Sequence, residues 1–151
     1  MADELWWAVK PSLLNYVAAL GDGGVQLAEG ARGSLITGFT FPVAAPSDGG
    51  APPEVIEARG VVTLVGHGVR ILEIRDPQLV RVSDSATLSV RRWAGRETRL
   101  TVAIFGPSAT TGELTRWEDG RLQSPGRELF DFRYPEGETL GPVELRHNEA
   151  T

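Results

Sequence analysis

The stretch VVTLVGHGVRILEIR, residues 61–75, decides the fold class. Two runs rich in Val, Ile and Leu flank a Gly-His-Gly segment, and glycine readily adopts the positive φ angles that a two-residue hairpin turn needs. Short runs rich in β-branched and aliphatic residues, bounded by turn-forming residues, are typical of strands. The pattern predicts a tight β-hairpin that holds His67 at its tip.

Turn-forming residues divide the rest of the chain in the same way. The sequence contains 18 glycines and 10 prolines among short runs of Val, Ile, Leu and Thr. This predicts one mainly-β domain over residues 1–151, a β-sandwich or flattened barrel. The stretch Pro42–Pro53 is rich in Pro, Gly, Ala and Ser and predicts a loop. The predicted strands are Val25–Leu27, Ser34–Phe41, Glu54–Val65, Val69–Arg75, Leu79–Val82, Ala86–Arg92, Arg99–Phe105, Leu114–Glu118 and Leu129–Tyr134.

An N-terminal α-helix is predicted over Pro11–Leu20. Proline suits the first turn of a helix, and Gly21 ends the run. Leu13 and Val17 recur at helical spacing and form an apolar stripe. Ser12 and Tyr16 are four residues apart, so their hydroxyl groups share one face of the helix.

Composition excludes several classes of function. The net charge of −5 and the scattered basic residues argue against nucleic acid as a partner. The absence of cysteine excludes disulfides and thiolate metal sites. The opening residues, MADELWWAVK, resemble neither a signal peptide nor a membrane segment. We expect a cytoplasmic protein from the chain as written, or an extracellular or cell-surface protein if a leader has been removed.

Tyr16 and His67 are the candidate functional residues. Taken singly, each also has an ordinary explanation. A histidine in a tight turn is commonly a solvated polar residue, and a tyrosine on a helix commonly covers a core with its hydroxyl at the rim.

Together the two segments resemble the HtaA-type haem-binding domain of actinobacterial haem-uptake proteins. Three stretches carry the resemblance, in the family's order: WAVKPSLLNY (7–16), GVVTLVGHGVRILEIRDPQLV (60–80) and ELFDFRYPEGETLGPVEL (128–145). The resemblance implies that Tyr16 is the axial ligand of haem iron and that His67 hydrogen-bonds the ligating oxygen. It also implies a contact between Ser12 and a haem propionate.

This assignment is chemically coherent. Ferric iron is a hard acid that suits a phenolate oxygen, and tyrosine is a known axial haem ligand. A free phenol loses its proton only near pH ~10, so the iron must favour the phenolate, and an imidazole N–H would tune the bond. We therefore expect one ferric haem b. From position along the chain, Leu13, Val17, Phe39 and Phe41 are candidate pocket walls, and Lys10 and Arg70 are candidate propionate partners.

The expected function is non-enzymatic haem binding for haem transport or handling, by a monomer or homodimer that exchanges haem with other haem-carrier proteins. One alternative is a related β-rich module that does not bind haem and instead binds a protein. A second is a haem-dependent enzyme with His67 as acid or base. No pair of carboxylates has a spacing that indicates other catalytic chemistry.

Overall fold

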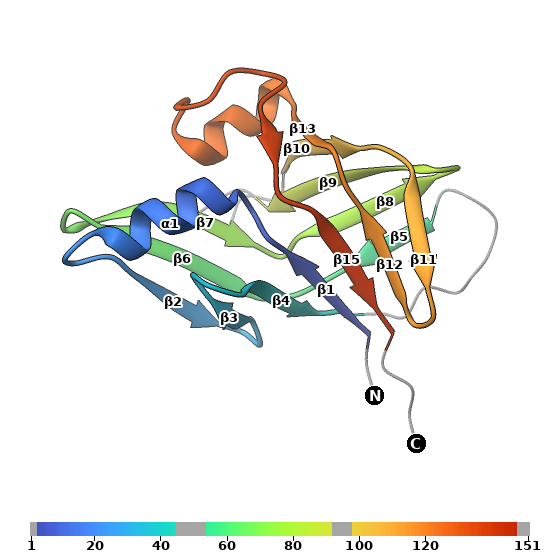
Figure 1. Cartoon of the computed structure of the whole chain (residues 1–151), viewed down its shortest axis with the longest axis horizontal. Coiled ribbons are helices and arrows are strands. Elements are labelled where there is room, and N and C mark those ends of the chain that lie inside the picture. Colours follow the sequence, from blue (N-terminus) through green and yellow to red (C-terminus); the bar gives the residue numbers. More distant parts are fainter. Residues whose placement is uncertain (1–2, 45–53, 92–97, 148–151) are drawn as a thin grey trace.

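Most of the described chain forms antiparallel β-strands (Figure 1). The structure is a computed structural model that describes residues 3–44, 54–91 and 98–147. The helices are α1 (Pro11–Ala19) and the 3₁₀ helix η1 (Ser124–Phe130). The strands are β1 (Glu4–Trp7), β2 (Gly24–Ala28), β3 (Arg32–Ser34), β4 (Gly38–Pro42), β5 (Glu54–Glu57), β6 (Val61–Gly66), β7 (Val69–Arg75), β8 (Gln78–Val82), β9 (Ser85–Arg91), β10 (Arg99–Phe105), β11 (Ser108–Thr111), β12 (Leu114–Trp117), β13 (Gly120–Leu122), β14 (Thr139–Leu140) and β15 (Val143–Arg146).

Within the described residues, these strands form two six-stranded sheets and one three-stranded sheet. The first sheet has the order β11-β12-β15-β1-β4-β3, and the second has the order β14-β13-β10-β9-β8-β5. The third consists of β2, β6 and β7. The sheets stay open, so the mainly-β prediction is confirmed as a sandwich-like fold, and the flattened barrel is not formed.

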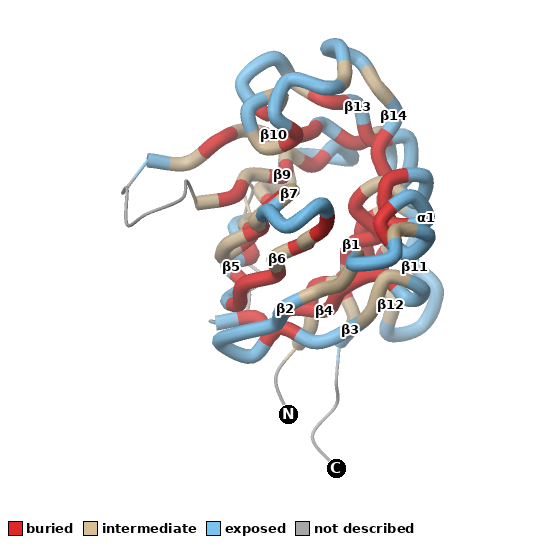
Figure 2. The backbone as a smooth tube through the Cα atoms, turned by 90° about the vertical axis from the view of Figure 1, so that its left-hand side faces the viewer, coloured by how far each residue is buried: buried red, intermediate tan, exposed pale blue. Residues whose placement is uncertain are grey.

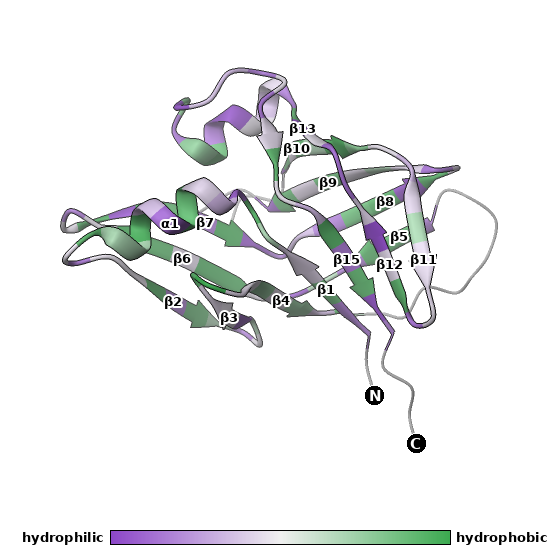
Figure 3. Cartoon of the chain, in the orientation of Figure 1, coloured by the Kyte–Doolittle hydropathy of each residue, from purple (hydrophilic) through white to green (hydrophobic). Residues whose placement is uncertain are grey.

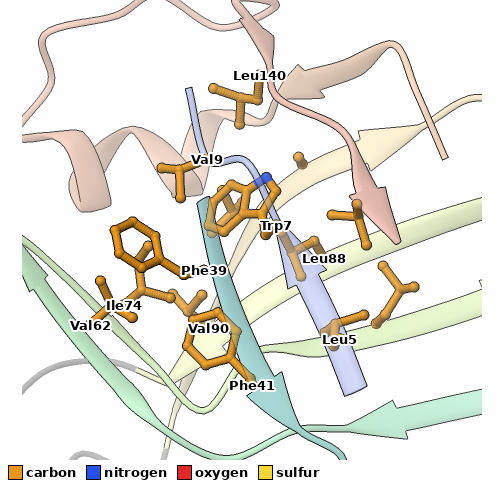
Figure 4. Close-up of a cluster of buried hydrophobic side chains, with 14 of the residues drawn as sticks. Leu5, Trp7, Val9, Phe39, Phe41, Val62, Ile74, Leu88, Val90 and Leu140 are labelled. Atoms are coloured by element: carbon orange, nitrogen blue, oxygen red, sulfur yellow. The ribbon is translucent and has the colours of Figure 1, made fainter. Parts of the chain in front are cut away.

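The core lies between the sheets, and several strands bury alternate residues against it. Hydrophilic and hydrophobic segments alternate along the strands (Figure 3), and burial follows the same period in β1, β9 and β12. Figure 2 places the buried backbone inside the molecule, with the tip between β6 and β7 exposed. Residues from β1, β4, β6, β7 and β9 meet in the core (Figure 4): Leu5, Trp7, Phe39, Phe41, Val62, Ile74, Leu88 and Val90.

A strained bend directs the chain from β1 into α1. Val9 has φ 62°, an unusual value for a β-branched residue, and its side chain is fully buried. Its carbonyl accepts the N–H of Gly141 at 2.7 Å, and the N–H of Ala8 bonds the Pro142 carbonyl at 3.1 Å. A Cβ on Gly141 would lie 2.7 Å from the Ala8 Cβ, so only glycine allows this approach. The bend therefore brings the first and third family-like stretches into contact.

Several predicted elements are confirmed. The helix forms as α1, and β7 has the predicted bounds. The strands predicted at Val25–Leu27, Leu79–Val82, Arg99–Phe105 and Leu114–Glu118 correspond to β2, β8, β10 and β12. The strand predicted at Ala86–Arg92 corresponds to β9, with Arg92 outside the described residues. Of the predicted loop, Pro42 belongs to β4, and residues 45–53 lie outside the described residues.

Other elements differ from the prediction because turns interrupt them. The predicted strand Glu54–Val65 is wrong as one element, since Gly60 at φ 137° separates β5 from β6, which belong to different sheets. The predicted strand Ser34–Phe41 is wrong for a similar reason. The Ser34 hydroxyl accepts the N–H groups of Ile36 and Thr37, and the resulting turn separates β3 from β4.

The strand predicted at Leu129–Tyr134 is also wrong. Here η1 runs to Phe130, and Asp131 and Phe132 follow at φ 54° and 59°. The Asp131 N–H bonds back to the carbonyls of Arg127 and Glu128, so the chain curls and does not extend. The prediction also missed β1, β11, β13, β14 and β15.

Candidate functional site

Helix α1 presents the phenol of Tyr16 to the tip of the β6–β7 hairpin. Leu13, Leu14 and Val17 are buried on the inner face of the helix, and Tyr16 is 48% exposed on the outer face. Its hydroxyl lies 2.8 Å from Nε2 of His67, and the two ring centroids are 6.2 Å apart. The structure therefore brings together the two residues that lie 51 positions apart in the chain.

His67 occupies a strained turn. Gly66 pairs with Val69, so His67 and Gly68 form a two-residue connection, with φ angles of 55° and 74°. Two successive positive φ angles define a type I′ geometry, which favours Asn or Gly at the first position. The turn thus holds the imidazole in a left-handed conformation against the neighbouring phenol.

Asp22, in the loop after α1, braces the same turn. Its two carboxylate oxygens accept the backbone N–H groups of His67 and Gly68, each at 2.9 Å. These two hydrogen bonds, first that of His67 and then that of Gly68, lower the pKa of the Asp22 carboxyl. The composition and motifs gave no indication of this residue, since its partners are backbone groups of a distant segment.

Lys10 joins α1 to the C-terminal segment. Its ammonium lies 2.7 Å from the Glu138 carboxylate, donates to the Thr139 carbonyl at 3.2 Å and lies 4.9 Å from the ring centre of Tyr134. Only 11% of its side chain is exposed. The Lys10 ammonium is therefore already engaged by groups of the C-terminal segment.

A cleft of about 420 Å³ opens between β7 and η1. Its lining mixes apolar and charged residues, and a smaller cavity beside it shares Ile71, Leu72 and Arg133 and reaches Leu13 on α1. Val69, two residues after His67, lines the cleft, and Leu13, three residues before Tyr16, lines the smaller cavity; Tyr16 and His67 themselves line neither. The cleft is lined by Val69, Arg70, Ile71, Leu72, Glu73, Val90, Arg91, Leu100, Glu128, Leu129, Asp131 and Arg133.

The other predicted site residues divide into two groups. Ser12 is exposed four residues before Tyr16, and Leu13 and Arg70 line the cavities, with Arg70 Nη1 3.6 Å from the Glu73 carboxylate.

The second group lies in the core. Val17, Phe39 and Phe41 have no exposed surface, so as placed they have none to offer a ligand. Of the four predicted pocket walls, Leu13 lines one of the two cavities described above.

Two residues that the prediction missed border the cleft region. Arg133 lines both cavities, and among the described residues its guanidinium has no ion pair. Phe132 is 60% exposed, next to Arg133, with the Arg127 guanidinium 5.7 Å from its ring centre. Both lie in the segment DFRYP of the third family-like stretch. Their place in that stretch is the sequence signal that could have indicated them.

These features define a sandwich-like β protein that exposes a hydrogen-bonded tyrosine–histidine pair beside a cleft. The sequence profile of the HtaA family (Htaa) matches residues 2–146, so the chain belongs to this family. No curated protein sequence shows a significant match. Among the described residues, no helix is long and apolar enough to cross a membrane.

Three crystal structures of proteins from Corynebacterium glutamicum share the fold. The C-terminal domain of HtaA superimposes with a TM-score of 0.71 at 20% identity, covering 96% of this chain and 94% of that one. The N-terminal domain of HtaA gives 0.67 at 22% identity, with 99% and 98% covered. The haem-binding protein HtaB gives 0.66 at 22% identity, with 96% and 92% covered.

Proposed function

We propose that this chain is a non-enzymatic haem-binding protein that holds one ferric haem b through Tyr16, for haem transport or handling. The observation that carries the proposal is the exposed Tyr16 hydroxyl 2.8 Å from His67 Nε2. Membership of the HtaA family supports it, as does the similar fold of the haem-binding protein HtaB.

The donor set fits this ligand. Haem supplies a ferric iron, a hard acid for which an anionic oxygen is a suitable axial ligand. Tyr16 offers that oxygen from a rigid helix, on a face open to solvent. His67 would donate its Nε2–H to the phenolate, withdrawing electron density from the oxygen and stabilising the ionised form. The role of His67 is then to tune the bond between Tyr16 and the iron.

The surroundings suit a flat apolar ligand that carries acidic groups. Val69, which lines the cleft, is 60% exposed, and Phe132, between the lining residues Asp131 and Arg133, is also 60% exposed. Ser12 adds a hydroxyl at the N-terminal end of the Tyr16 helix face. A porphyrin held by Tyr16 could cover this apolar surface and leave its propionates near polar side chains.

The first test is a haemin titration of the wild type and His67→Ala, followed by visible absorption. We expect saturable one-to-one binding with tyrosinate charge-transfer bands in both proteins. Loss of the imidazole should shift these bands and weaken binding by about tenfold, within the range typical of a group that supports a metal ligand. Asp84→Ala, an exposed residue in the β8–β9 turn, is the control and should match the wild type.

The titration and an assay of peroxide turnover separate the alternatives. Weak, unsaturable binding by the wild type would favour the β-rich module that recognises a protein. Steady turnover of peroxide by the loaded protein, lost in His67→Ala, would favour the haem-dependent enzyme.

Arg133 is the propionate partner that we favour over Lys10 and Arg70. Lys10 is held by Glu138, and Arg70 lies near Glu73, whereas Arg133 has no ion pair among the described residues. Arg133→Gln should weaken haemin binding by up to about fivefold, the scale of an exposed ion pair. Binding of haem dimethyl ester, which lacks the carboxylates, should not change.

Arg59→Gln is the matched control for this prediction, since Arg59 is exposed between β5 and β6 and does not line the cleft. Arg133→Lys keeps the charge and should bind haemin nearly as well as the wild type. An equal loss of affinity for haemin and its dimethyl ester would show that Arg133 contacts another part of the ligand or supports the fold.

A further inference from the structure

The Asp22 carboxylate links the loop after α1 to the hairpin that carries His67. One oxygen accepts the His67 N–H and the other accepts the Gly68 N–H, each at 2.9 Å. In sequence, Asp22 is 45 residues from His67 and 46 residues from Gly68. This contact is therefore a second connection between the Tyr16 helix and the His67 turn, independent of the bond between their side chains.

The loop that carries Asp22 is itself fastened to the end of α1. The Leu20 N–H bonds the Val17 carbonyl at 3.1 Å, and the Gly23 N–H bonds the Leu20 carbonyl at 3.3 Å. A Cβ on Gly23 would lie 1.9 Å from the Val17 carbonyl oxygen, so the loop packs directly on the helix. These contacts hold Asp22 at a defined place relative to Tyr16. One helical turn and the start of a short loop separate the two residues along the chain.

The hairpin tip also packs against the end of the helix. A Cβ on Gly66 would lie 2.6 Å from Leu20 Cδ1, so the β6–β7 turn approaches the helix closely just before His67. His67 and Gly68 both have positive φ angles, and a left-handed histidine persists only where its surroundings enforce it. The paired hydrogen bonds from these two residues to one carboxylate supply that enforcement.

We propose that Asp22 is a positioning residue that holds the His67 imidazole at hydrogen-bonding distance from the Tyr16 phenol. Asp22 acts through the backbone of the turn and does not touch the ligand. Its consequence for haem affinity rests on the proposed function, whereas its effect on the Tyr16–His67 bond does not.

The positioning role can be tested without haem. The chain has two histidines, and His147 bonds Asp3 at 3.0 Å, so its imidazole signals give an internal reference in nitrogen-15 NMR. Tyr16→Phe defines the His67 Nε2 signal with the bond broken. In Asp22→Ala we expect the His67 signal to move to that position, and in Asp22→Asn, which keeps one acceptor oxygen, to move part of the way. A His67 signal that stays at its wild-type position in folded Asp22→Ala would overturn the proposal.

A double-mutant cycle with haemin tests the same role in the loaded protein. Asp22→Ala should weaken haemin binding by about five- to tenfold, close to the about tenfold effect of His67→Ala. If Asp22 acts through His67, the double variant should bind within about twofold of His67→Ala alone. Losses that multiply, to about 50-fold or more, would instead show that Asp22 supports the whole site and not His67.

Two controls complete the design. Asp84→Ala, in an exposed turn of another sheet, should leave both the NMR signals and haemin affinity at their wild-type values. If the wild type fails to bind haemin, the proposed function fails, and the NMR comparison still decides whether Asp22 positions His67.

Discussion

Tyr16→Phe should abolish specific haem binding, with affinity for haemin reduced by more than about 100-fold. The substitution removes only the oxygen that would ligate the iron, and losing a direct ligand should exceed the 10- to 100-fold cost typical of supporting groups. The tyrosinate charge-transfer bands should disappear with it. The ring stays in place, and one exposed hydrogen bond is lost, so the free energy of unfolding should change by no more than about 1 kcal/mol.

Tyr134→Phe is the matched comparison because the chain has only two tyrosines. Its ring packs edge-on against Phe130 at 5.5 Å, and removing its hydroxyl should leave the tyrosinate bands in place. Loss of these bands in Tyr134→Phe, with retention in Tyr16→Phe, would assign the iron ligand to Tyr134 and refute the proposal.

Tyr16→Phe also frees His67 Nε2, and a free imidazole can itself ligate iron. The double variant Tyr16→Phe/His67→Ala therefore shows whether residual binding comes from His67. We expect any imidazole-type spectrum of Tyr16→Phe to vanish in the double variant.

The sequence predicted best the parts of the molecule that local patterns determine. The β6–β7 hairpin follows from two runs rich in Val, Ile and Leu around Gly-His-Gly, and the start of α1 follows from Pro11 and the Leu13–Val17 stripe. The region of residues 129–134 has the composition of a strand, but the left-handed Asp131 and Phe132 curl it. Such turns depend on tertiary contacts, so the composition alone could not indicate them.

The contact between Tyr16 and His67 could not be predicted from their separation in the sequence. Tyr16 and His67 approach each other only because the β1–α1 bend at Val9 and the packing of Gly66 near Leu20 orient helix and hairpin together. The family resemblance indicated both residues. It could not indicate Asp22, which acts on backbone groups, or the contact of Lys10 with Glu138, which joins distant segments.

Two of the candidate pocket walls, Phe39 and Phe41, are buried in the core of this structure. Phe39 and Phe41 were chosen from their position in the chain, and both alternate with Gly38 and Thr40 on a strand that is buried on both faces. β4 lies between β1 and β3, with Phe39 opposite Trp7 in β1 and Gly33 in β3. A central strand of this kind offers its side chains to the core.

Phe39→Ala should therefore destabilise the protein by about 3–5 kcal/mol, the cost of emptying a large aromatic site in a core. Phe39 has no exposed surface and packs in the cluster that contains Trp7, Val62 and Ile74 (Figure 4). For a chain of this length, such a loss corresponds to a fall in Tm of roughly 10 °C, measurable by calorimetry or urea unfolding. Ile36→Ala is the control, because Ile36 is 92% exposed and its loss should cost less than about 0.5 kcal/mol.

Haemin affinity decides whether Phe39 belongs to the core or to the ligand site. Phe39→Leu removes less volume, should cost about 1.5 kcal/mol and should leave enough folded protein for titration. Because the ring has no surface open to a ligand, haemin affinity measured well below Tm should stay within about twofold of the wild type. A large loss of affinity with an unchanged Tm would place Phe39 against the porphyrin, and would require β4 to move when the ligand binds.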